Sequence, residues 1–61
     1  MAADDAELSS ITTALDELRH RITTLAERNA GDEDETLAQG LFDVERTLGE
    51  ALRRLARIGQ A

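Results

Sequence analysis

Few of the 61 residues carry side chains that act as nucleophiles, proton carriers or metal ligands. The chain has no cysteine and a single histidine, His20. His20 falls at the outermost position of a predicted helix, where a solvated surface residue is expected rather than a ligand or a general base. A di-iron bundle needs two Glu-x-x-His pairs, whereas the sequence has this spacing once, at Glu17 and His20, and it has no glycine-rich phosphate loop. The sequence therefore predicts no enzymatic activity, no catalytic residue, no metal and no cofactor.

The densest run of charge is the acidic segment 32–35, DEDE. It lacks the alternating ligand spacing of a calcium-binding EF-hand loop. Asp32 and Glu35 instead have the spacing of a helix-capping box, and acidic side chains are favourable at the positive end of a helix dipole. Gly31, just before the run, suits the left-handed residue that ends a preceding helix. We therefore interpret this segment as the junction between two helices.

Composition indicates one small, all-helical domain, residues 1–61. Proline, tryptophan and tyrosine are absent, and there is one phenylalanine; alanine, leucine, glutamate and arginine dominate, as in coiled coils. A chain of this length buries too little surface to be more than marginally stable alone, and without cysteine the remaining means of stabilisation is oligomerisation. The net charge of -6 argues against nonspecific binding to nucleic acid or anionic lipid.

The apolar residues are too interrupted to form a membrane span, and the first residues, MAADDAEL, are acidic where a signal peptide is basic. We therefore expect a cytoplasmic protein without a membrane partner. All seven basic residues are arginine, a bias that indicates a bacterial genome rich in G and C.

Apolar residues recur at alternating steps of three and four, which predicts an antiparallel helical hairpin, that is, a two-helix coiled coil. The expected elements are helix 5–29, turn 30–34 and helix 35–58. In the first helix the a positions of the heptad are Leu8, Leu15 and Ile22, and the d positions are Ile11, Leu18 and Leu25. The hairpin turn then predicts core layers that pair Leu8 with Ile58, Ile11 with Leu55, Leu15 with Ala51, Leu18 with Leu48, Ile22 with Val44 and Leu25 with Leu41.

A second stripe, at the e and b positions, predicts an interface. A glycine inside a helix costs about 1 kcal/mol, and an exposed phenylalanine gains nothing, so Gly49 and Phe42 point to another helix docking there. We expect a homodimer, in which two hairpins form a four-helix bundle; the alternative is a different protein's helix on the same face. Glu45 and Arg19 are expected to pair across this face. The predicted interface residues are Ala38, Phe42, Glu45, Gly49, Leu52, Ala56, Thr12, Arg19, Thr23 and Ala26.

The expected dimer resembles the Rop-like regulators of plasmid copy number, which bind RNA. The resemblance is one of architecture over the whole chain, without a shared motif, and the first helix here lacks the aromatic residue that Rop-like binding uses. It implies an alternative role in RNA or DNA binding, carried by Arg21, Arg28, Arg54 and Arg57. The favoured function is a non-enzymatic protein-protein interaction module, an adaptor or small regulator that binds itself and another protein of unknown identity.

Overall fold

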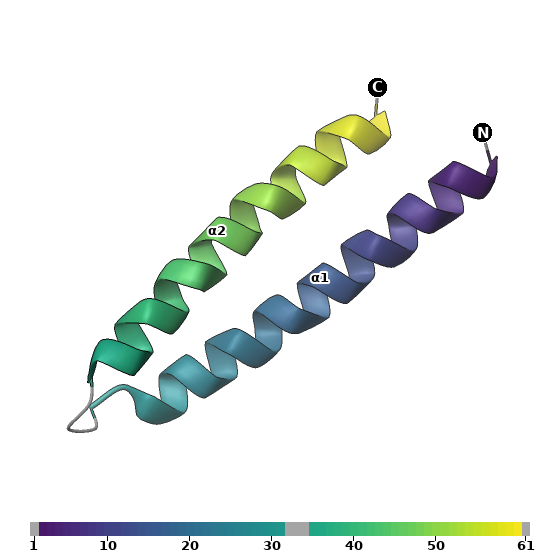
Figure 1. Ribbon diagram of the computed structural model, residues 1–61. Helices are drawn as coiled ribbons and strands as arrows, with labels where there is room; N and C mark the ends of the chain where they lie inside the picture. Colours follow the sequence, from purple (N-terminus) through teal and green to yellow (C-terminus); the bar gives the residue numbers. More distant parts are fainter. Residues whose placement is uncertain (1, 32–34, 61) are drawn as a thin grey trace.

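The chain folds into two long antiparallel helices, as a computed structural model shows for residues 2–31 and 35–60 (Figure 1). Helix α1 spans Ala2–Asn29 and helix α2 spans Glu35–Gln60. The predicted all-α antiparallel hairpin is therefore confirmed. Both helices run slightly beyond the expected ranges, α1 at its start and α2 at its end. Neither is apolar over a stretch long enough to cross a membrane, within the described residues.

The end of α1 has the features expected from its sequence. Gly31 adopts a positive φ of 90°, the left-handed conformation that glycine enters without steric cost. The Ala30 amide donates to the Glu27 carbonyl oxygen at 3.4 Å, and the Asn29 side chain donates to the Leu25 carbonyl oxygen at 2.7 Å. The expected cap at Asp32 lies outside the described residues.

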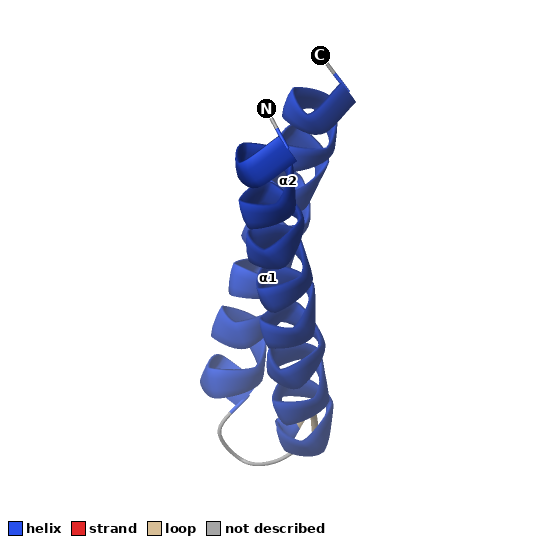
Figure 2. Ribbon diagram, turned by 90° about the vertical axis from the view of Figure 1, so that its right-hand side faces the viewer, coloured by secondary structure: helices blue, strands red, loops and turns tan. Residues whose placement is uncertain are grey.

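The hairpin is a thin rod in which each helix has only one neighbour. Its Cα atoms extend over 50 × 15 × 10 Å, and the edge-on view places one helix behind the other in a single layer (Figure 2). The radius of gyration of 14.4 Å exceeds the value of about 10.5 Å typical of a compact domain of this length. Both broad faces of the layer are therefore left uncovered by the chain itself.

The contact between the helices is made mainly by the a and e positions, not by the a and d positions that the sequence predicted. The most buried residues are the e residues Ala26, 0% exposed, and Ala38, 4% exposed, together with the b residue Gly49. No large side chain among the described residues is fully buried. The a positions are half-buried: Leu8, Leu15, Ile22, Leu41, Leu48 and Leu55.

The predicted core layers are wrong in all of their d members except the half-buried Ala51. Leu18 is 45% exposed and Val44 47% exposed, although each was assigned to a core layer. Leu8 lies beside Gly59, the residue after its predicted partner Ile58, and is 3.6 Å from the position that a Cβ atom would occupy at Gly59. The small e residues Ala26 and Ala38 explain the change. They let the helices approach closely on that side, so each helix is turned by about 50°, one position of the heptad wheel.

We predict that Ala26→Leu destabilises the hairpin by about 1 to 3 kcal/mol, because the site has no room for a larger side chain. The control is Ala56→Leu, which makes the same change at an exposed position of α2. Urea denaturation followed by circular dichroism measures both. Equal stability of the two variants would contradict the observed seam.

Candidate interaction surfaces

The two broad faces of the hairpin differ in chemistry. Since a and e positions face inward in both helices, the d positions of both lie on one face and the b positions on the other. We call the first the aliphatic face. It consists of two series at seven-residue spacing: Ile11, Leu18 and Leu25 on α1, and Leu37, Val44, Ala51 and Ile58 on α2.

The aliphatic face is exposed over the length of the hairpin. Its six large side chains are between 37% and 62% exposed, with Leu25 at the lower limit and Ile58 at the upper. The whole chain exposes 4814 Å², whereas a compact monomer of this mass exposes about 3,900 Å². Soluble monomers rarely leave a contiguous apolar surface of this kind in water. Sequence reasoning missed this face because it assigned every d residue to the core.

Charges of opposite sign border the aliphatic face along α1. Arg21 and Arg28 line a shallow hollow together with Leu18, Ile22 and Leu25. Glu7 and Ala14 occupy the same heptad position as these arginines, further toward the start of the helix. This edge is therefore acidic near the open end of the hairpin and basic near the turn.

We call the opposite face, on the side of the b positions, the mixed face. It carries what remains of the predicted interface. Gly49, Ala26 and Ala38 are buried between the two helices of one hairpin, so they have little surface to offer a second chain. Phe42, 37% exposed, and Ala56 are exposed. The half-buried members are Thr12, Arg19, Thr23, Glu45 and Leu52. That these residues form an interface remains a prediction.

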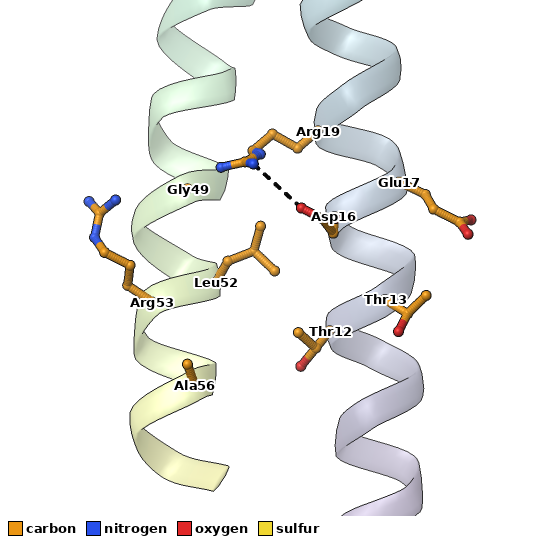
Figure 3. Close-up of a pocket in the computed structure, with 9 residues that line it drawn as sticks. All are labelled: Thr12, Thr13, Asp16, Glu17, Arg19, Gly49, Leu52, Arg53 and Ala56. Carbon is orange, nitrogen blue, oxygen red and sulfur yellow. Dashed lines mark ion pairs between the residues drawn. The ribbon is translucent and has the colours of Figure 1, made fainter. Parts of the chain in front are cut away.

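Gly49 has a structural role inside the hairpin. The guanidinium of Arg19 crosses from α1 and lies over it, with Nη1 3.5 Å from the position of a Cβ atom at residue 49 (Figure 3). Arg19 also forms an ion pair with Asp16, Nη2 to Oδ1 at 3.5 Å, one turn earlier on α1. The expected partner, Glu45, forms no ion pair with Arg19 in the described part of the chain. A small residue at this position thus leaves room for Arg19 to cross the seam.

Some of the polar side chains in the hollow beside Gly49 are already engaged within α1. It is lined by Thr12, Thr13, Asp16, Glu17, Arg19, Gly49, Leu52, Arg53 and Ala56 (Figure 3). The Thr12 hydroxyl donates to the Leu8 carbonyl oxygen at 2.9 Å, and Asp16 is engaged by Arg19. Glu17 points away from the other helix in this view.

His20 lies on the surface of α1 and is bonded to its own helix. The His20 side chain is 70% exposed, and its Nδ1 donates to the Asp16 carbonyl oxygen at 2.9 Å. Over residues 2–31 and 35–60, no group of three or more potential ligand side chains is placed to hold a metal ion.

The four arginines of the nucleic-acid alternative are not brought together. Arg21 and Arg28 line one small hollow with His20 and Thr24 on the part of α1 that leads to the turn. The remaining pair lies near the end of α2, at the opposite end of the hairpin: Arg54 and Arg57. The structure therefore does not join the two pairs into one basic patch.

Comparison with known proteins finds no family model, no curated protein sequence and no solved structure that matches this chain. The architectural resemblance to Rop-like regulators gains no support from these comparisons.

Substitutions at two glycines of α2 test the path of Arg19. We predict that Gly49→Ala stabilises the hairpin by about 0.5 to 1 kcal/mol through helix propensity, since the new methyl group would meet Arg19 at an ordinary contact distance. Gly40→Ala is the matched control, because nothing lies within 4 Å of a Cβ atom there.

Gly49→Leu should lose this gain, because the larger side chain must displace the Arg19 guanidinium. Thermal denaturation of the three variants measures the order of their stabilities. A Gly49→Leu variant as stable as Gly49→Ala would show that Arg19 does not occupy this position.

Proposed function

We propose that this chain is a self-associating interaction module, in which two hairpins stack through their aliphatic faces into a four-helix bundle. The observation that carries the proposal is the exposure of six large aliphatic side chains along one face. Without a partner, the hairpin leaves in water the side chains that a small domain needs for its stability. A second layer of helices on this face would give the leucines of both hairpins a common core.

The surface area supports a second copy as the occupant. The chain exposes about 900 Å² more than a compact monomer of its mass. A stable protein-protein interface removes about 800 Å² from each partner. A second copy presents the same long, flat, aliphatic surface, and a two-fold axis makes such a surface self-complementary. The excess area therefore matches what dimerisation of two identical hairpins would bury.

The aliphatic face is a better candidate for this contact than the stripe that the sequence indicated. The small residues of that stripe, Gly49, Ala26 and Ala38, already serve the contact between α1 and α2. In a dimer stacked through the aliphatic face, the mixed face points outward. Phe42 and the hollow beside Gly49 then remain accessible to a different protein, as an adaptor or small regulator requires.

We predict that the wild-type chain is a dimer at tens of micromolar and that Leu18→Glu abolishes the dimer. Burying an unpaired charge costs about 3 to 5 kcal/mol, and each dimer would contain two such charges. Thr24→Glu is the matched control, since it adds the same charge at an exposed position of the same helix, away from the aliphatic face. Light scattering coupled to size-exclusion chromatography gives the masses.

The variant Phe42→Glu tests which face of the hairpin forms the dimer contact. It should leave the dimer intact, because Phe42 lies on the mixed face. Loss of the dimer in Phe42→Glu with retention in Leu18→Glu would move the interface to the mixed face. A wild-type chain that is helical and monomeric at several hundred micromolar would overturn self-association and leave the aliphatic face for a different protein.

A further inference from the structure

We infer that the two hairpins stack with their turns at opposite ends, so that α1 lies antiparallel on α1 of the second copy, about a two-fold axis near Leu18. This inference rests on the proposed dimerisation and specifies its geometry. A two-fold stack of flat hairpins has two possible arrangements. In one, the turns lie at opposite ends and like helices are neighbours. In the other, the turns lie at the same end and α1 lies on the partner's α2.

The charged edge of α1 favours opposite ends. With the axis near Leu18, antiparallel α1 helices bring Glu7 close to the partner's Arg28, and Ala14 close to the partner's Arg21. The symmetry makes each of these contacts twice. Glu7 and Arg28 are exposed, and neither forms an ion pair with another residue of the ranges 2–31 and 35–60. Both can therefore reach a partner in the second copy, while the two Arg21 side chains face alanine rather than each other.

The same-end arrangement offers no such compensation. The contact of Leu8 with Gly59 sets the register within the hairpin, and it places Arg21 within one residue of the level of Thr47 and Arg28 within one residue of the level of Gly40. Turns at the same end preserve these levels between copies, so both arginines of α1 would face uncharged residues of the partner's α2.

Packing is compatible with the opposed arrangement. Leu18 of α1 and Ala51 of α2 lie at about the same height along the hairpin. A two-fold axis at this height makes Leu18 face Leu18 of the second copy and Ala51 face Ala51 of the second copy. The same layer therefore contains one pair of large side chains and one pair of small ones. Ile11 then meets the partner's Leu25, and Val44 meets the partner's Ile58. Each exposed aliphatic residue in these pairs gains an apolar neighbour.

Single cysteines separate the two arrangements, because the natural chain contains none. We expect Leu18→Cys alone and Ala51→Cys alone each to form a covalent dimer under mild oxidation or with a short bis-maleimide, since each residue faces its own copy. In the same-end arrangement Leu18 faces the partner's Ala51, so a covalent dimer forms efficiently only when the two variants are mixed. A cysteine in place of the exposed Thr24 is the control for random collision.

The outcomes test dimerisation and the arrangement of the two hairpins separately. Covalent dimers in both single variants, well above the control, support opposed hairpins. A non-covalent dimer that links only in the mixture overturns this inference and leaves the proposed function intact. A chain that is monomeric by light scattering overturns both.

Charge reversal tests the contact between copies directly. Glu7→Arg and Arg28→Glu should each raise the dimer dissociation constant by about 5-fold or more at low ionic strength, because two ion pairs are lost per dimer. The double variant restores pairing in the opposite sense and should recover most of the loss, although both changes are unfavourable for the α1 dipole. Glu27→Arg is the control, with the same change of charge on the far side of α1. Additive losses in the double variant would overturn the contact.

Discussion

A two-helix hairpin can enclose only a narrow seam, and the remaining structure depends on which side chains occupy it. Here the most buried residues are Ala26, Ala38 and Gly49, all of them small. Small side chains let the helix axes approach, which adds dispersion contacts along both backbones. The consequence is that the larger d residues are turned aside onto one face. Close approach within the hairpin thus produces its most apolar surface.

The sequence predicted the hairpin because its signals are local. The spacing of Leu8, Ile11 and Leu15 specifies a helix, and Gly31 specifies where the helix ends, without reference to the rest of the chain. The rotation of each helix about its own axis, in contrast, is not specified by local sequence. A heptad pattern indicates that a positions face the partner, but whether d or e joins them depends on side-chain volumes across the seam. The small side chains of Ala26 and Ala38 are what favours the e positions here, whereas the sequence pattern alone places these alanines in an outer stripe.

Among the ion pairs, too, the one within a single helix is local and the one expected across the seam is not. Asp16 and Arg19 are one turn apart on α1 and pair within it, whereas the pair expected across the hairpin, Arg19 with Glu45, is not formed by these two side chains. Contact across the seam requires the correct rotation as well as opposite charge. The structure uses Arg19 differently, by passing its guanidinium over Gly49 while retaining Asp16 (Figure 3). The side chain of Arg19 therefore explains a small residue at position 49 of α2, where alanine would fit as well as glycine.

The position of the two buried alanines gives the hairpin an internal gradient of protection. Ala26 and Ala38 lie in the half of the hairpin next to the turn, while Ile58, near the open end, is 62% exposed. Opening that starts at the free ends breaks few contacts, whereas opening near the turn must separate the tightest part of the seam. Amide hydrogen exchange in a single hairpin would accordingly be slowest around residues 22–29 and 38–45 and fastest at the start of α1 and the end of α2.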